Sequence, residues 1–469
     1  MPRKAVAIVL WCGLIGAAIF VYFTFPRTKD EIPRSENQRP FPSSPGPNGV
    51  PMPEPVPAPN TPKPPPGGGP NLRVMAWAGD DDARALSREM DAFAARTGLQ
   101  PVLNVSANAA DYRRDLRHAI DAGTPPDVCL VEARDFSGLD PGRDLARMAS
   151  PPGFEQRALE AFQAGGNGDL RAVPDEFSVA LLFYHPHDFD RAGLGWPGKH
   201  WTWDILEAMS RALASQRLTT DAGAQIYPLE LPADFDFWNI LCTQAGHAAL
   251  DHGTWHLADA DGRESRMRGL GLIHEFFQEL AVTAPPDAEG QPGTYFAQNR
   301  ASLLIGPSEL GATLPPGSYG VTLLPADLTR ASLAQVNGWA VMASTPQLDA
   351  ARSLASFLAA HPVHAGWVSA VRPTQGVDPT ADDADSLCRE ALEQALLPRL
   401  EPKTERLAQL LDEQIGLFAR NGDPAAAENL NAKIESEYLA DYAPTAERNA
   451  AERKQGVVPK AQAPELRGL

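Results

Sequence analysis

The stretch of sequence that decides the fold is residues 171–184, R-A-V-P-D-E-F-S-V-A-L-L-F-Y, where a polar run with two carboxylates opens into continuous apolar residues. Pro174 cannot donate a backbone hydrogen bond to a neighbouring strand and stands near the start of the run. We therefore predict a strand that is entered through residues 175–178 and is buried over residues 179–183. Two interpretations of Asp175 and Glu176 are then open: solvated loop charges, or side chains at a strand end that meet a ligand.

Composition narrows the class of protein. A chain of 469 residues, 43% of them hydrophobic, is long enough for two or three domains with substantial cores. The 59 acidic and 41 basic residues give a net charge of -18, which excludes a nucleic-acid partner because phosphate neutralisation needs clustered Lys and Arg. A small neutral or cationic ligand fits better. Four widely separated cysteines predict neither a zinc knuckle nor a disulfide framework: Cys12, Cys129, Cys242 and Cys388.

The N-terminus predicts a membrane anchor. Arg3 and Lys4 precede an uncharged apolar run of residues 5–25, which as a helix is long enough to span a hydrocarbon core of about 30 Å. We predict that residues 1–25 are an uncleaved transmembrane helix with its N-terminus inside and the rest of the chain extracytoplasmic. A cleavable signal peptide is the alternative, but the run is long for one and no A-x-A pattern follows it closely.

Two further segments lack the apolar residues that a core requires. Residues 26–70 are rich in proline and glycine and predict a disordered, semi-extended linker. Residues 443–469 are polar without a periodic apolar face and predict a disordered tail. The folded part is therefore expected between residues 71 and 442.

The folded part opens with alternating strand and helix patterns. Residues 71–77 alternate as a strand does, and Leu86, Met90 and Phe93 then recur at helical spacing. Strands are expected again at residues 102–105 and 128–131, with a helix between them. This β-α-β-α-β order predicts an α/β fold with a mainly parallel sheet, in which ligands bind at the carboxyl ends of the strands.

Two of those strand ends are polar. Asp81 and Asp82 suit the first turn of the following helix, where carboxylates complement the helix dipole, so Asp80 is the better ligand candidate. Glu132 and Arg134 follow the third strand. These two side chains form either a surface ion pair or a clamp for a ligand.

Several runs of the sequence together resemble extracellular solute-binding proteins of family 1, the maltose- and multiple-sugar-type receptors of bacterial ABC transporters. The resemblance extends in order from about residue 72 to residue 442. It rests on the runs A-D-Y-R-R-D-L-R-H-A-I-D-A-G-T-P-P-D-V, L-R-A-V-P-D-E-F-S-V-A-L-L-F-Y, H-W-T-W-D-I-L-E-A-M, S-Y-G-V-T-L-L-P and N-G-W-A-V.

The resemblance implies two α/β lobes of the type II periplasmic-binding-protein fold, joined by crossing strands, with the ligand in the cleft and closure by hinge bending. On this template the opening stretch is the first crossing and Glu176 meets the ligand, while Asp175 braces the turn. The implied crossings are residues 171–184, 301–307 and 337–339. The implied segments are residues 71–178 and 306–336 for lobe one, and residues 179–305 and 337–442 for lobe two with its C-terminal helices.

Carbohydrate sites combine aromatic rings with carboxylates, amides and arginines, because a sugar presents both C–H faces and hydroxyls. Trp238 and Trp339 stand where the resemblance places cleft aromatics, although each could equally pack in a core. The expected ligand-binding residues are Asp80, Glu132, Arg134, Glu176, Trp238 and Trp339. No catalytic residue, metal or cofactor is expected; the spacing of His185, His187, His361 and His364 could suit a metal, but Pro186 favours an exposed turn.

The predicted function is a monomeric, membrane-tethered receptor on the bacterial cell surface or in the periplasm. It would bind a small polar solute, a sugar or oligosaccharide, and deliver it to the permease subunits of an ABC importer. Three alternatives stay open: a sensor or scavenger without transport, a polyamine- or metal-binding receptor, and a glycoside hydrolase. The hydrolase would use Glu132 and Glu176 as an acid/base pair with carboxyl groups about 5–10 Å apart.

Overall fold

The computed structural model describes residues 71–164, 168–285, 293–373, 384–422 and 424–442. The predicted membrane anchor (residues 1–25), linker (26–70) and tail (443–469) lie outside these ranges. Within the described residues, no helix combines the length and the apolar composition that crossing a membrane would require.

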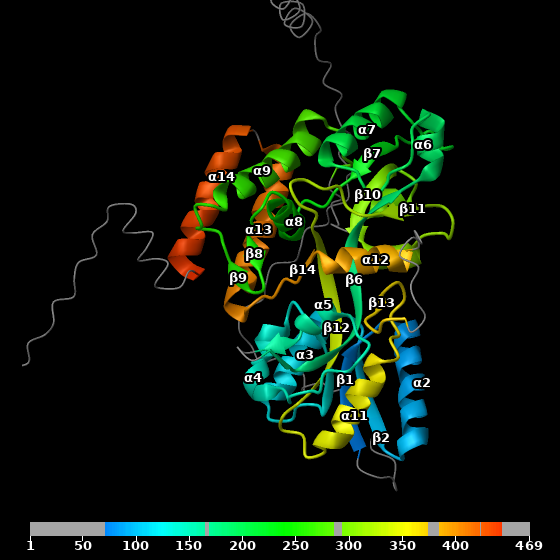
Figure 1. Ribbon diagram of the computed structural model, residues 1–469, viewed down its shortest axis with the longest axis vertical. Helices are drawn as coiled ribbons and strands as arrows, with labels where there is room; N and C mark the ends of the chain where they lie inside the picture. The colour runs from blue at the N-terminus through cyan, green and yellow to red at the C-terminus, as the bar shows by residue number, and fades with distance from the viewer. Residues whose placement is uncertain (1–70, 165–167, 286–292, 374–383, 423, 443–469) are drawn as a thin grey trace, which may run out of the picture. The chain divides into compact units, whose positions relative to one another are not determined.

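A ten-stranded sheet is the largest sheet of the described part of the chain (Figure 1). Strands β1 and β2 are parallel, as are β1 and β3, whereas β12 is antiparallel to β3 and β6 and parallel to the short strand β14. The main path of the sheet is, in order, β2 (Gln100–Ser106), β1 (Asn71–Trp77), β3 (Val128–Glu132), β12 (Ser332–Val341), β6 (Ala172–Tyr184), β10 (Ala301–Pro307) and β7 (Tyr227–Glu230). Three short strands pair beside it: β11 (Gly320–Thr322) and β13 (Val368–Ser369) with β6, and β14 (Ala395–Leu396) with β12.

The stretch quoted above forms the long strand β6, and it belongs to two lobes. Its N-terminal half pairs with β12 and β13, and its C-terminal half, from Ala180 to Tyr184, pairs with β10 and β11. The first lobe thus contains β1, β2, β3 and β13, and the second contains β7, β10 and β11. The predicted strand is confirmed, and its burial begins earlier than expected, at Ala172.

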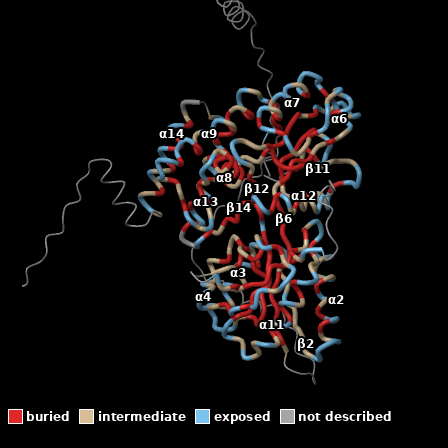
Figure 2. Tube along the Cα trace, in the orientation of Figure 1, coloured by how far each residue is buried: buried red, intermediate tan, exposed pale blue. Residues whose placement is uncertain are grey.

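Helices cover both lobes, and the buried backbone follows the strands (Figure 2). The first lobe carries α2 (Asp80–Thr97), α3 (Ala109–Asp121) and α11 (Leu348–Ala359). The second lobe carries α6 (Pro186–Ala192), α7 (Trp203–Gln216), α8 (Phe235–Gln244), α9 (Arg263–His274), α13 (Pro402–Asn421) and α14 (Pro424–Glu437). Helix α12 (Ala384–Glu393) packs on β6, β11 and β12 where these strands meet.

Local sequence explains the first βαβ unit. Helix α2 buries Leu86, Met90 and Phe93, which are the apolar positions that helical spacing predicted. Its first turn is acidic, and it ends at Gly98, whose φ of 75° is a conformation that glycine adopts without steric cost. The predicted β-α-β-α-β order is confirmed over residues 71–132.

The strand pairing differs from the expected division into segments. Residues 337–341 pair with β3 and with the N-terminal half of β6, and α11 then packs on β3 and α2, all within the first lobe. Residues 320–322 pair with residues 182–184 in the second lobe, and among the described strands β10 pairs with β7 and the C-terminal half of β6. The cause is β12, which carries the chain from the second lobe back into the first and buries Trp339 there.

Candidate functional site

The carboxyl ends of β1 and β3 face a hollow of about 440 Å³, which we call the cleft hollow. Because β1 and β3 are parallel and adjacent, their carboxyl ends lie at one edge of the sheet, where α/β folds bind ligands. The walls come from both strands, from α3 and from the segment that leads into α13. The polar and aromatic side chains that line the cleft hollow include Trp77, Tyr112, Arg113, Glu132, Asp135 and Glu405.

A second hollow of about 310 Å³ shares Arg113 and Glu132 with the first and extends to Arg134 and Gln335. Gln335 lies on β12, next to the point where that strand passes between the lobes. The two hollows therefore form one polar region at the cleft side of the first lobe.

One arginine serves two carboxylates in this region. The Arg113 guanidinium donates to Glu132 Oε2 at 3.2 Å and forms an ion pair with Asp135. Burial raises the pKa of Glu132, and the neighbouring Asp135 charge raises it further. Burial likewise raises the pKa of Asp135. Together, the Arg113 guanidinium can donate hydrogen bonds to the hydroxyls of a ligand, and the Glu132 and Asp135 carboxyl groups can accept hydrogen bonds from them.

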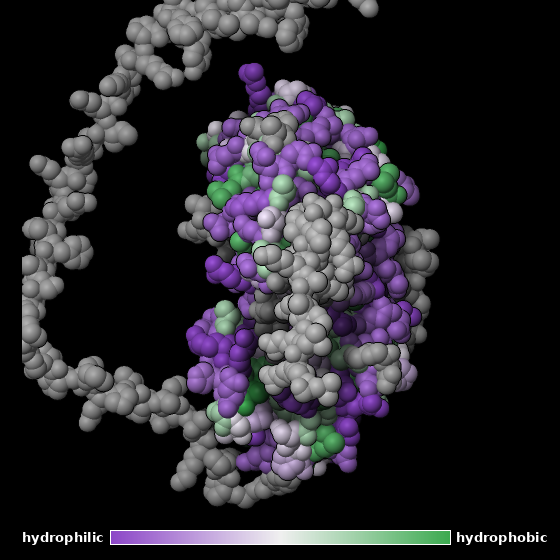
Figure 3. Space-filling model, turned by 90° about the vertical axis from the view of Figure 1, so that its left-hand side faces the viewer, coloured by the Kyte–Doolittle hydropathy of each residue, from purple (hydrophilic) through white to green (hydrophobic). Residues whose placement is uncertain are grey.

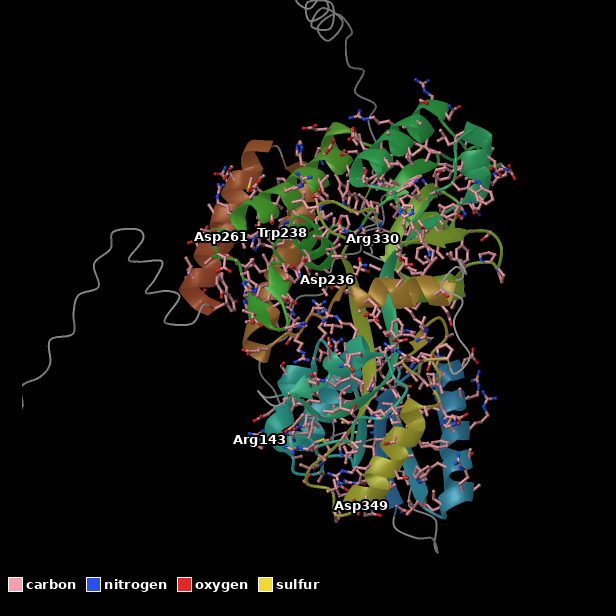
Figure 4. All side chains as sticks on the ribbon, in the orientation of Figure 1. Arg143, Asp236, Trp238, Asp261, Arg330 and Asp349 are labelled. Atoms are coloured by element: carbon pink, nitrogen blue, oxygen red, sulfur yellow. The ribbon has the colours of Figure 1, made fainter. Side chains whose placement is uncertain are left out.

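Arg134 joins the first lobe to the second. Its guanidinium forms an ion pair with Asp236 of α8, and the two side chains are equally exposed, at 27%. Figure 4 shows Asp236 on the part of α8 nearer the first lobe. Two more carboxylates lie in this group: Asp234, which accepts from Phe237 N at 2.8 Å and caps α8, and Asp412, which accepts from Phe235 N at 2.8 Å. Burial first, and then the Asp236 charge, raise the pKa of Asp234 to about 7.

A β-bulge turns two successive carboxylates of β6 toward the same interior space. Glu176 pairs with Asn337 and Pro174 pairs with Gly338, so Asp175 is the additional residue between them. Asp175 Oδ2 accepts from Trp339 Nε1 at 3.0 Å, and Glu176 forms an ion pair with His364. Both carboxylates are buried, with exposures of 1% and 0%. Glu176 thus lies inside the first lobe and not at the surface of the cleft hollow.

The structure separates the remaining expected residues. Asp80 is exposed at the start of α2 and does not line the cleft hollow. Trp339 is 1% exposed and Trp238 is 0% exposed, so both are core residues. Trp238 donates from Nε1 to the Arg266 carbonyl at 3.2 Å, in the interior of the second lobe (Figure 4). Of the six expected residues, Glu132 and Arg134 line the two hollows.

Two aromatic side chains line the cleft hollow, the buried Tyr112 and the partly exposed Trp77, and neither is among the residues expected from the sequence. Trp77 is the last residue of β1, is partly exposed, and lies with its ring centroid 5.2 Å from that of His364. The signal was present in the sequence: a tryptophan that ends a parallel strand stands at the edge where ligands bind. Arg113 was missed because its role depends on where α3 packs relative to β3.

Comparison with known proteins adds a family and a fold. A family model described as "Bacterial extracellular solute-binding protein" matches residues 79–365. A comparison of the sequence with curated proteins found no match.

Solved structures share this fold at low sequence identity. The sugar-binding protein MalE of Xanthomonas citri is 18% identical, with a TM-score of 0.64 over 82% of this chain and 100% of that one. The ABC substrate-binding protein Lmo0181 of Listeria monocytogenes, in complex with cycloalternan, is 17% identical, with a TM-score of 0.62 over 78% and 98% of the two chains. A solute-binding protein of Thermotoga lettingae bound with alpha-D-tagatose is 15% identical, with a TM-score of 0.60 over 78% and 99%. The structural similarity therefore covers nearly the full length of each of the three solved proteins.

Proposed function

Because the chain belongs to the bacterial extracellular solute-binding protein family, we propose that it binds a sugar or oligosaccharide in the cleft hollow and delivers it to the permease subunits of an ABC importer. The observation that carries this proposal is the position of Trp77, a partly exposed indole at the carboxyl end of β1 beside the Arg113, Glu132 and Asp135 group. An indole stacks on the C–H face of a sugar, while the charged group exchanges hydrogen bonds with its hydroxyls.

The chain is a binding protein and not an enzyme, because its family is one of solute-binding proteins. The geometry agrees with this. Glu176, which a glycoside hydrolase would need as a partner for Glu132, is fully buried and ion-paired with His364. The carboxyl pair that the hydrolase alternative requires is therefore not presented to a ligand.

Carbohydrate as the ligand class is supported by the solved structures, since Lmo0181 holds cycloalternan and the Thermotoga lettingae protein holds alpha-D-tagatose. These ligands differ greatly in size, so the panel that tests the proposal spans monosaccharides to oligosaccharides. The volume of the cleft hollow, about 440 Å³, is in the range of small-molecule sites.

Closure of the lobes on the ligand would bend the strands that cross between them, β6 and β12. The ion pair between Arg134 and Asp236 joins the two lobes and would favour the closed arrangement. We further propose that residues 1–25 anchor the chain in the membrane and that residues 26–70 serve as a tether, so that a monomeric binding domain works outside the cytoplasm. An extracellular family supports this placement.

The proposal is tested on the full chain in detergent with a panel of mono- and oligosaccharides, by the shift of the unfolding temperature. A ligand that binds the folded state raises this temperature. Trp77→Ala should abolish the shift, whereas Trp196→Ala should preserve it, because Trp196 is 54% exposed on the second lobe and does not line the cleft hollow. Stabilisation by polyamines with none by any sugar would refute the carbohydrate assignment and favour a receptor for cations.

A further inference from the structure

Four polar side chains from three separate segments meet in the interior of the first lobe. Asp175 and Glu176 come from β6, Asn337 comes from β12, and His364 comes from the segment between α11 and β13. Their exposures are 1%, 0%, 0% and 7%. One ligand-type atom from each of Asp175, Glu176 and His364 lies within 4.8 Å of the others.

Each of these side chains has one polar atom held by a neighbour. Asp175 Oδ2 accepts from Trp339 Nε1 at 3.0 Å, and Glu176 Oε1 lies 3.4 Å from Asn337 Nδ2, which donates to it. His364 Nε2 lies 3.4 Å from the Trp77 carbonyl oxygen, so Nε2 is the nitrogen that carries a proton for this bond. The neighbours orient the four groups much as second-shell partners orient metal ligands.

Three of the remaining side-chain oxygens in this cluster have no hydrogen-bond partner within the described residues. These are Asp175 Oδ1, Glu176 Oε2 and Asn337 Oδ1, and each of them is buried. All three are acceptors. A buried acceptor without a donor costs about 1–3 kcal/mol, so three together in one place indicate that something electropositive belongs there.

Charge gives the same indication. Two buried carboxylates face a single imidazole, and a third carboxylate lies close by: Glu309, in the segment after β10, accepts a hydrogen bond from Ser178 of β6. Burying charges of one sign is costly unless they are compensated. A divalent cation with two carboxylates and a neutral imidazole makes the site neutral, which one water molecule cannot do.

We propose that Asp175, Glu176, Asn337 and His364 bind one divalent transition-metal ion, such as Zn²⁺ or Mn²⁺, in a structural site beneath Trp77. Imidazole nitrogen with carboxylate oxygens is a ligand set that such ions accept. Metal–ligand distances of about 2.0–2.2 Å allow ligand atoms to lie up to about 4.4 Å apart, so small side-chain movements bring the cluster into place.

When the metal ion binds, it replaces a proton on His364 Nδ1. In the structure His364 Nδ1 is ion-paired with Glu176 Oε1, so Nδ1 carries a proton there. The ion takes the lone pair of Nδ1, the proton leaves to solvent, and Nε2 keeps its proton and its bond to the Trp77 carbonyl. The ion then ties β6 and β12 to the segment that supports Trp77. This inference does not depend on which solute the cleft hollow binds.

The test measures metal content on the full chain, purified without metal-affinity chromatography, saturated separately with Zn²⁺ and Mn²⁺, and passed through a desalting column. We expect about one equivalent of one of these ions, and a lower unfolding temperature after the chain is refolded with EDTA. His364→Gln and Asp175→Asn should each reduce the affinity for the ion about tenfold or more. The matched control is His361→Gln, because His361 is exposed on the same segment and should leave metal binding unchanged.

A wild-type measurement guards against variants that fail to fold. Co²⁺ added to the metal-free wild-type chain should produce the visible absorption bands of a protein-bound ion, and Zn²⁺ should abolish them. The proposal is overturned if the wild-type chain retains neither ion and gives no Co²⁺ bands. It is equally overturned if folded His364→Gln or Asp175→Asn chains bind the ion as the wild type does.

Discussion

The guanidinium of Arg134 forms an ion pair with the carboxylate of Asp236, and this pair connects the end of β3 in the first lobe to α8 in the second. Arg134 was selected from the sequence as half of a surface ion pair or as a ligand clamp. The structure gives it a third use, as a contact between lobes. Asp234 and Asp412 surround the same position, so the guanidinium also offsets repulsion among three carboxylates.

Removing this contact should loosen the lobes. Asp236→Asn keeps the size of the side chain but removes its charge, and we expect it to lower the free energy of unfolding by about 1 kcal/mol and to favour the open arrangement. Small-angle scattering should show a larger radius of gyration without ligand. Arg143→Ala is the control, because its ion pairs with Asp140 and Asp144 are at the surface, where the arginine side chain is 73% exposed (Figure 4). An unchanged radius in Asp236→Asn would contradict the role of the pair.

The raised pKa of Asp234 gives stability a defined pH dependence. The folded state holds the proton up to about pH 7, while the unfolded chain loses it near the ordinary value of 3.8, so this group's contribution to stability falls as pH rises from about 4 to about 7. Asp234→Asn removes the titration but keeps the cap of α8, since Asn is also a good N-cap. The unfolding temperature of the variant minus that of the wild type should therefore increase as the pH is raised from 5 to 8. A difference that does not depend on pH would show that Asp234 has an ordinary pKa.

The space around two glycines, Gly338 on β12 and Gly271 on α9, predicts opposite effects of substitution by alanine. A Cβ on Gly338 would lie 2.6 Å from a ring carbon of Phe162 and 2.8 Å from the Val173 carbonyl oxygen. Gly338→Ala should therefore destabilise the protein by about 1–3 kcal/mol. A Cβ on Gly271 meets nothing within 4 Å on the exposed side of α9, so Gly271→Ala should stabilise by about 0.5–1 kcal/mol. Denaturant unfolding measures the stability of both variants. A Gly338→Ala protein as stable as the wild type would contradict the close packing of β12 against Phe162 and Val173.

Local sequence patterns predicted the elements of the first lobe well. The alternation in residues 71–77 and the helical spacing of Leu86, Met90 and Phe93 became β1 and α2, because both patterns report directly on which face is buried. The resemblance to the solute-binding family supplied the two-lobed arrangement, which the family match and the solved structures support.

Features that depend on long-range pairing could not be predicted from the sequence. The bulge that buries both Asp175 and Glu176 exists only because β12, about 160 residues farther along the chain, pairs with β6. Trp238 and Trp339 resemble cleft tryptophans by their position in the sequence, but both are buried in the cores of their lobes. His364 joins the two carboxylates through a loop whose position no local pattern determines.

Outside the cleft hollow, the described residues in view in Figure 3 form no large apolar patch. The face seen in Figure 3 is mainly hydrophilic, in line with the net charge of -18, and apolar side chains are scattered over it in small groups. In the proposed site, the side chains at the strand ends recognise the solute. Glu132→Gln should weaken the binding of a sugar about tenfold, because the amide loses the ion pair with Arg113 that orients both groups. Isothermal titration measures this, and equal affinities would remove Glu132 from the site.

The most direct test of the account is the titration of Trp77→Ala and wild-type chains with the carbohydrate that stabilises the wild type most. Isothermal titration should give one saturable site per wild-type chain, no measurable binding to Trp77→Ala, and unchanged binding to Trp196→Ala. Equal affinity of the Trp77→Ala and wild-type chains, or no carbohydrate that binds the wild type at all, would contradict the claim that the cleft hollow is a sugar site.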